Sequence, residues 1–318
     1  MSAKVVFLAR DDDLHADAVL DHCGRLGLDV IRFDVSRIQR KTLRGTIAIG
    51  EDLSWSLESN SLYVDANSDI AIFCRDFELS SAPSTLDLER SVIFEEWRSF
   101  LNGWAGLVPK TRWLDHPTLQ AYWDNKLLQT SLAKSIGFKV PKTIATNVPQ
   151  VVRDYASSDD LVIKQLSNMA FLDLEGKDEF IYTTPVDQER LKFVDEVANC
   201  PVLIQERIKK VADLRVTVVG DRLFPALIRS NWNSADAVDF RAVPEESFEE
   251  VSIPPGLGEL IRKIMHRMEL RYAAFDFGVT ASDEYVFFEA NVCGNWLWIE
   301  HATGLGISSA LAQLLARI

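Results

Sequence analysis

The chain has 318 residues, of which 47% are hydrophobic and 25% charged, a composition ordinary for a globular protein of two or three subdomains. The formal net charge of −13 argues against nucleic acid as a general partner, because neutralising phosphates needs clustered Lys and Arg. The sequence contains no run of 18 or more apolar residues, which excludes a membrane-spanning helix.

The first residues and the cysteines predict a cytoplasmic protein. Residues 5–9 form an apolar run, but Asp11, Asp12 and Asp13 follow it at once, without the small-residue cleavage site of a signal peptide. The four cysteines, which form no Cys-x-x-Cys pair, are Cys23, Cys74, Cys200 and Cys293. They indicate neither a disulfide framework nor a zinc site.

The N-terminal third has the pattern of a βαβ unit. Residues 4–9 predict a buried strand, residues 14–26 an amphipathic helix that ends at Gly27, and residues 30–34 the next strand. The unit lacks the Gly-x-Gly-x-x-Gly motif of dinucleotide-binding proteins. We therefore interpret it as a scaffold or a partner-binding domain.

Short strands are predicted over residues 46–73, with 70–73 the clearest, and a helix over residues 87–102. The character of the sequence changes around His116 and Pro117, where we place a domain boundary.

Two lysines stand out in the central part. A single helix is predicted over residues 119–136, with a stop at Gly137, and Lys126 lies early in it, where a lysine is most often merely exposed. Residues 161–165 predict an apolar strand that contains Lys164, and burying that cation without a partner would be costly. A phosphate is a natural partner, and a lysine on an edge strand is the alternative. The sequence has no Gly-x-x-x-x-Gly-Lys-Ser/Thr motif, which excludes a P-loop protein.

A basic strip follows. Residues 201–208 predict a strand, and residues 213–223 a hairpin that turns at 219–222. From Arg207 to Arg241 there are seven Lys or Arg and four Asp, a local charge of +3 in an acidic chain. The strip could face a nucleotide or an acidic substrate, although a solvated face of a sheet would have the same composition.

A second hairpin is predicted from residues 273–278 and 284–291. Strand side chains alternate, so Phe287 is expected on the face of Glu289 and Asn291, and Phe288 on the opposite face. If the turn centres near Ser282, Asp276 lies beside Glu289 and Asn291. Two carboxylates and an amide are ligands that suit Mg²⁺. The spacing alone leaves open that the acids are solvated or paired with Lys or Arg.

Several ordered motifs resemble those of the ATP-grasp ligases. The C-terminal motifs are Asp276, Glu289-x-Asn291, Gly294-Asn295-Trp296-Leu297-Trp298 and Glu300-x-x-Thr303-Gly304. The earlier motifs are Asn125-Lys126, residues 137–147, Lys164, Gln205-Glu206-Arg207-Ile208, Asp213-x-Arg215, Ile228-Arg229-Ser230 and Asp239-Phe240-Arg241. Within this superfamily they are most similar to the peptide maturases that make graspetides, the microviridin-type macrocyclised peptides. The resemblance covers residues 110–318, and the N-terminal third fits only loosely.

The resemblance implies a site for ATP and Mg²⁺. Asp276, Glu289 and Asn291 would hold Mg²⁺ against the ATP phosphates. The nucleotide would be bound by Lys126, Lys164, Gln205, Glu206, Ile208 and Asp213, with the lysines on the phosphates and the main chain of residues 205–208 on adenine. The catalytic and substrate-binding residues would be Arg215, Arg229, Asp239 and Arg241. Residues 167–177 would form a mobile cover over the phosphates.

The implied fold is the α/β ATP-grasp fold, which clasps ATP between antiparallel sheets. Its parts would be an N-terminal βαβ domain over residues 1–117, a central subdomain over 118–203 and a C-terminal subdomain over 204–318. The implied activity is ATP-dependent joining of Asp or Glu side chains of a ribosomal precursor peptide to hydroxyls or amines, as intramolecular ω-esters or ω-amides. A homodimer is also implied by the resemblance.

Two departures from the family pattern bear on the substrate. Arg229 stands where many graspetide synthetases carry His, and it is the residue type found there in the ribosomal-protein glutamate ligases. Residues 291–295, Asn-Val-Cys-Gly-Asn, replace the more usual Asn-Pro-Asn-Gly-Gln. Neither departure removes a metal ligand, but both bear on substrate and subfamily. Two alternatives stay open: an intermolecular ligase that adds amino acids to a peptide or protein, and a nucleotide-binding regulator without turnover.

Overall fold

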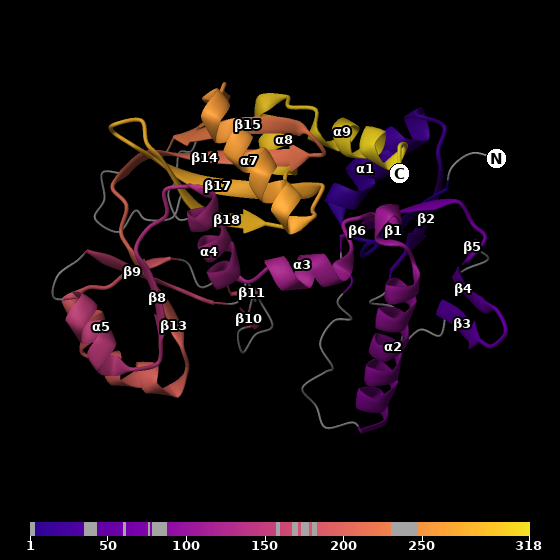
Figure 1. Cartoon of the computed structure of the whole chain (residues 1–318), viewed down its shortest axis with the longest axis horizontal. Coiled ribbons are helices and arrows are strands. Elements are labelled where there is room, and N and C mark those ends of the chain that lie inside the picture. Colours follow the sequence, from indigo (N-terminus) through magenta and orange to yellow (C-terminus); the bar gives the residue numbers. More distant parts are fainter. Residues whose placement is uncertain are drawn as a thin grey trace.

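The computed structural model describes residues 4–34, 43–59, 62–75, 77, 88–156, 160–166, 171–172, 178–179, 183–229 and 247–318. Its largest sheets are a parallel sheet in the N-terminal part, a four-stranded antiparallel sheet in the central part and a five-stranded antiparallel sheet in the C-terminal part (Figure 1). None of the described helices is long and apolar enough to cross a membrane.

The N-terminal part begins with the predicted βαβ unit. β1 (Lys4–Leu8), α1 (Leu14–Arg25) and β2 (Asp29–Phe33) are followed in the same parallel sheet by β6 (Ile70–Cys74) and β7 (Trp113–Leu114), in the order β2-β1-β6-β7. Asp13 caps α1, because its carboxylate accepts hydrogen bonds from the N–H groups of His15 at 2.9 Å and Ala16 at 3.2 Å.

The two faces of β1 enter two different cores. Val5 and Phe7 pack with α1 and with α9 (Ile307–Leu315), which lies beside α1 in Figure 1. Val6 and Leu8 pack on the opposite face, in a core that includes Trp104. That core is shared with α2 (Leu88–Leu107) and with the antiparallel sheet of β3 (Leu43–Ile49), β4 (Leu53–Ser59) and β5 (Leu62–Asp65), which confirms the predicted helix and short strands.

The helix predicted over residues 119–136 is two helices, so that prediction was wrong in its length. After η2 (Lys110–Arg112), α3 (Pro117–Trp123) ends before Asn125, and α4 (Lys126–Ile136) begins after it. The Asn125 side chain accepts from the N–H groups of Leu127 at 3.0 Å and Leu128 at 3.1 Å, the geometry of an N-cap, for which Asn is a preferred residue. Gly137 ends α4 as predicted, with a left-handed φ of 114°.

The central sheet has the order β12-β9-β13-β8. Its elements and neighbours are β8 (Thr143–Thr146), α5 (Pro149–Ala156), β9 (Leu161–Lys164), β10 (Phe171–Leu172), β11 (Asp178–Glu179), β12 (Thr184–Pro185), α6 (Gln188–Leu191), η3 (Val194–Asn199) and β13 (Val202–Glu206). β9 has a neighbouring strand on each side, so Lys164 does not belong to an edge strand.

The C-terminal sheet has the order β16-β15-β14-β17-β18. Its strands are β14 (Lys210–Val219), β15 (Arg222–Arg229), β16 (Ser247–Glu250), β17 (Tyr272–Thr280) and β18 (Tyr285–Asn291), with the helices α7 (Pro255–Met268) and α8 (Leu297–Thr303). Leu214 and Val216 of β14 pack with α7 in one core. Because side chains alternate along a strand, Asp213 and Arg215 belong to the opposite face.

Asp115 joins the first sheet to the C-terminal sheet. It directly follows β7, it is 3% exposed, and its carboxylate accepts hydrogen bonds from the N–H groups of Arg271 at 3.0 Å and of Tyr272 at 2.8 Å. Burial raises the pKa of Asp115 to about 7, against the opposing effect of these N–H donors. The folded chain therefore retains a proton on Asp115 between about pH 4 and 7, where the unfolded chain has lost it.

We expect the free energy of unfolding that Asp115 contributes to fall as the pH rises through this window. Asp115→Ala should cost about 2 kcal/mol at pH 5, because two buried N–H groups lose their acceptor, and less at pH 8. Urea denaturation of both proteins at the two pH values measures the difference. A cost that grows with pH would contradict the raised pKa.

Candidate active site

The predicted oxygen cluster forms on the hairpin of β17 and β18. Asp276 and Glu289 lie opposite each other in the ladder, and Asn291 is two residues further along β18. The Asn291 amide nitrogen donates to Asp276 Oδ2 at 2.9 Å and to Glu289 Oε1 at 3.4 Å. All three side chains are half-buried. The hairpin therefore brings together the three residues that the sequence singled out as metal ligands.

The expected arrangement of the phenylalanines was wrong because β18 contains a bulge. The ladder register shifts between Asp276 and Phe277, so that Phe277 pairs with Phe287 and Phe288 is the extra residue. Phe287 is consequently fully buried in the core with Phe275 and Phe277. Phe288 is half-buried instead, and its ring lies beside charged side chains of the site.

Gly278 makes room for that ring. A Cβ atom at Gly278 would lie 2.6 Å from the Phe288 Cζ atom, closer than carbon atoms can approach. The bulge and the glycine are thus parts of one local arrangement.

Two lysines from different sheets flank Phe288. The Nζ atoms of Lys164 and Lys210 lie 5.0 Å and 5.5 Å from the centre of its ring, within the range of cation–π attraction. Lys210 also donates to both carboxylate oxygens of Asp213, at 2.7 and 2.8 Å. Lys126, the first residue of α4, donates to the carbonyl of Gln165, the residue that follows β9.

Lys210 was not singled out from the sequence. The available signal was its place three residues before Asp213, in the basic strip at the start of a strand. The ring contact that brings it to the site depends on the bulge, which has no signature in a single sequence.

Arg215 pairs with the first of the three oxygen ligands. Its Nη1 atom donates to the two carboxylate oxygens of Asp276 at 2.9 and 2.8 Å, and its Nη2 atom donates to the Asn295 carbonyl at 3.1 Å. Arg215 is 6% exposed, and its Nε finds no hydrogen-bond partner among the described residues. The oxygen cluster and the Arg pairing, which the sequence offered as alternatives, are both present.

Glu289 forms no ion pair within the described part of the chain. Within that part there is also no group of three His, Cys, Asp or Glu residues close enough to hold a metal ion. The donor set on the hairpin is two carboxylates and one amide, which are oxygen ligands of the kind that Mg²⁺ accepts and softer metals do not favour.

The residues expected at the adenine end connect the central and C-terminal sheets. Gln205 is 2% exposed and donates from Nε2 to Thr143 Oγ1 at 3.0 Å, so its side chain holds β13 against β8. Glu206 exchanges hydrogen bonds with the Lys142 main chain, donating from its N–H at 2.9 Å and accepting at Oε2 at 3.4 Å. Ile208 is half-buried between β13 and β14.

Of the remaining predicted residues, Arg229 is described, whereas Asp239 and Arg241 are not. Arg229 ends β15, and its guanidinium is 3.7 Å from the Glu249 carboxylate, with both side chains mostly exposed. Asp239 and Arg241 lie outside the described residues, as does the cover expected over residues 167–177 apart from β10.

No family model matches the chain, and no curated protein matches it in sequence. Solved structures do match over nearly all of it. The macrocyclase MdnC of Microcystis aeruginosa MRC, bound with precursor peptide MdnA, is 24% identical with a TM-score of 0.86, covering 99% of each chain. The macrocyclase MdnB of the same organism is 26% identical with a TM-score of 0.80, covering 98% of this chain and 99% of its own.

A third similar structure is a RiPP-associated ATP-grasp ligase of Chryseobacterium gregarium, in complex with ADP and a leader and core peptide. It is 24% identical, has a TM-score of 0.84, and covers 99% of this chain and 97% of its own. The chain has the ATP-grasp fold, as the resemblance implied, and the likeness includes the N-terminal third that the motifs did not reach.

Gly278→Ala is expected to reduce the free energy of unfolding by about 1–3 kcal/mol, because the Phe288 ring must leave its position. Adding Phe288→Ala should make the glycine substitution nearly neutral, and a double-mutant cycle by chemical denaturation measures that coupling. Gly256→Ala is the matched control, since nothing lies within 4 Å of its Cβ position in α7. Equal costs of Gly278→Ala with and without the Phe288 ring would show that the two residues are independent.

Proposed function

We propose that the chain is an ATP-dependent ligase that closes macrocycles in a ribosomal precursor peptide, as in graspetide biosynthesis. One observation carries the proposal: Asn291 bridges Asp276 and Glu289 on a hairpin whose bulged Phe288 has the Nζ atoms of Lys164 and Lys210 at 5.0 Å and 5.5 Å from its ring centre. Carboxylate and amide oxygens beside lysines from two sheets suit a magnesium nucleotide between those sheets. Solved macrocyclases share this fold over almost the entire chain.

Asp276, Glu289 and Asn291 are the residues that would hold Mg²⁺. The donor set fits, because all three side chains are half-buried, the Asn291 amide lies within hydrogen-bond distance of both carboxylates, and carboxylate and amide groups carry the oxygen atoms that Mg²⁺ accepts. Bound Mg²⁺ would offset charge on the phosphate oxygens during transfer. Arg215 keeps the Asp276 carboxylate oriented through its two hydrogen bonds.

The nucleotide phosphates would be met by lysines from three elements. Lys126 begins α4, Lys164 ends β9 and Lys210 begins β14. Their positive charges oppose the negative charge of a triphosphate, and Arg229 would add to them during transfer. The main chain of residues 205–208 would bind adenine.

The peptide would enter as a substrate with acidic side chains. A peptide carboxylate would attack the γ-phosphorus of ATP, releasing ADP and forming an acyl phosphate. A Ser or Thr hydroxyl or a Lys amine of the same peptide would then attack the acyl carbon, lose its proton and release phosphate. The peptide loses one water for each ring, and catalysis rests on positioning and electrostatics.

Arg215 is occupied by Asp276 and is nearly buried, so Arg241 is the proposed contact of the acidic peptide. The solved structures of MdnC and of the Chryseobacterium protein contain precursor peptides, which supports a peptide partner. A cytoplasmic homodimer completes the proposal.

An intermolecular ligase is the second candidate, because Arg229 is the residue type that the glutamate ligases carry at this place. A mass gain of the peptide would identify that activity, and a mass loss identifies the macrocyclase. A nucleotide-binding regulator without turnover would leave the peptide mass unchanged.

Incubation of the protein with ATP, Mg²⁺ and the precursor-like peptide encoded beside its gene should give successive losses of water in intact mass spectra. Glu289→Gln should reduce the rate by at least about 100-fold, because it removes a charged ligand. Glu284→Gln is the matched control on the same hairpin, since Glu284 pairs with Lys139 on the surface. Near-normal ring closure by Glu289→Gln would refute the assignment of the metal ligands.

Arg241→Ala should abolish ring closure while leaving the affinity for ATP within about twofold, if this residue contacts only the peptide. Nucleotide titration and mass spectrometry of the same preparation separate the two effects. An equal loss of ATP binding would mean that Arg241 belongs to the nucleotide site.

A further inference from the structure

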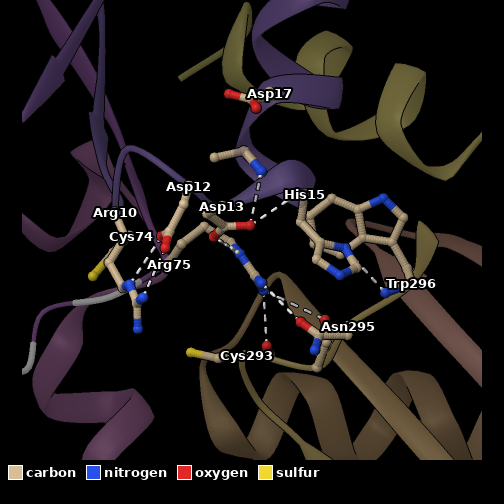
Figure 2. A network of polar contacts seen from close by, with 12 residues as sticks. Arg10, Asp12, Asp13, His15, Asp17, Cys74, Arg75, Cys293, Asn295 and Trp296 are labelled. Atoms are coloured by element: carbon tan, nitrogen blue, oxygen red, sulfur yellow. Dashed lines mark hydrogen bonds and ion pairs between the residues drawn. The ribbon is translucent and has the colours of Figure 1, made fainter. Parts of the chain in front are cut away.

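The loop of residues 292–296, which follows Asn291, is held by two arginines. Arg215 donates to the Asn295 carbonyl at 3.1 Å. Arg75 donates from Nη1 to the Cys293 carbonyl at 2.8 Å and from Nη2 to the Asn295 side-chain oxygen at 2.9 Å (Figure 2). The Tyr272 hydroxyl donates to the Gly294 carbonyl between them. Three of these contacts are to main-chain carbonyls, so the backbone of the loop is itself held in place.

Arg75 is itself fixed by the N-terminal part of the chain. It directly follows β6, and its N–H donates to the Leu8 carbonyl at 2.9 Å. Its Nε donates to Asp13 Oδ2 at 3.1 Å, while the other Asp13 oxygen caps α1. The side chains of Arg75 and Asp13 are 8% and 16% exposed, and the guanidinium lies 5.0 Å from the centre of the Trp296 ring.

Displacement of this loop would be transmitted to the site. A Cβ atom at Gly294 would lie 2.9 Å from Arg215 Nη2 and 3.0 Å from the Asn291 Cβ, so the loop backbone packs directly against both residues. Interiors packed this closely transmit strain instead of absorbing it. Arg215 binds Asp276, and Asn291 binds both carboxylates.

We infer that Arg75 is a positioning residue for the nucleotide–metal site, an inference that rests on the proposed function. Arg75 holds the loop from the N-terminal part of the chain. Asn291 and Arg215, which pack against that loop, are thereby kept where they orient the carboxylates of Asp276 and Glu289. The role needs an arginine, because one planar guanidinium serves Asp13, Cys293 and Asn295 in three directions. A lysine has a single nitrogen and cannot span these acceptors.

The first test is the affinity for Mg²⁺ with ADP, measured by calorimetry on the full chain. Arg75→Ala should weaken this affinity about 10–100-fold, the usual cost of losing a residue that orients metal ligands. Arg75→Lys should recover only a minor part of the loss. Guanidinium ion at millimolar concentration should restore affinity to Arg75→Ala, whereas methylammonium should not, because only guanidinium has three nitrogens for the three acceptors.

Two further variants keep the test independent of folding. Asp13→Asn retains a good N-cap for α1 but weakens the hold on Arg75, so it should lower the affinity in the same direction by a smaller factor. Arg10→Ala is the matched control, because Arg10 pairs with Asp12 on the surface of the same segment, and its affinity should equal that of the wild type.

The outcomes are distinct. A wild-type protein that binds no ADP with Mg²⁺ contradicts the proposed function and, with it, the inference. If the wild type and Arg75→Ala bind ADP with Mg²⁺ equally well, the inference is overturned and the proposed function is not, even where Arg75→Ala has a lower melting temperature. If Arg75→Ala fails to fold, wild-type affinity in both Asp13→Asn and Arg75→Lys overturns it.

Discussion

The site depends on one constraint: the strands of one sheet must place aromatic rings in the core on one face and charged side chains on the other. In β17 the rings of Phe275 and Phe277 are buried, and Asp276 between them belongs to the opposite face. An unpaired carboxylate in such a place would be costly, and Arg215 on the adjacent strand β14 compensates it. Asp213, two residues before Arg215 in β14, is likewise a nearly buried carboxylate, and Lys210 neutralises its charge. Core packing and the donor set are therefore specified by the same alternation of residues.

The irregular positions of the fold gather around this face. The bulge turns Phe288 toward Lys164 and Lys210, Gly278 gives its ring space, and Gly294 lets a loop lie against Arg215. Bulges and close backbone approaches commonly mark functional regions, because they redirect side chains that a regular strand would place elsewhere. The regular strands make the sheet rigid, and the bulge and the two glycines determine how the charged side chains are arranged on it.

Local patterns in the sequence predict most of the elements, including the βαβ unit, both hairpins, the end of α4 at Gly137 and the pairing of Asp276 with Glu289 and Asn291. They do not predict the break at Asn125, where one polar side chain outweighs a continuous apolar period. The bulge is not predicted for another reason: a shift of the strand register by one residue leaves the composition of the strand unchanged. Arg75 is missed because its partner Cys293 is 218 residues away along the chain, and no local pattern carries that contact.

The packing of α9 on β1 and α1 has a consequence for biosynthesis. One face of β1, with Val5 and Phe7, is completed by a helix at residues 307–315. On the ribosome β1 is made well before α9, so this part of its apolar face stays open while the sheets that carry the proposed site are being synthesised. Chains that are truncated or stalled before α9 would expose it, and such surfaces are the ones that chaperones bind and that aggregate.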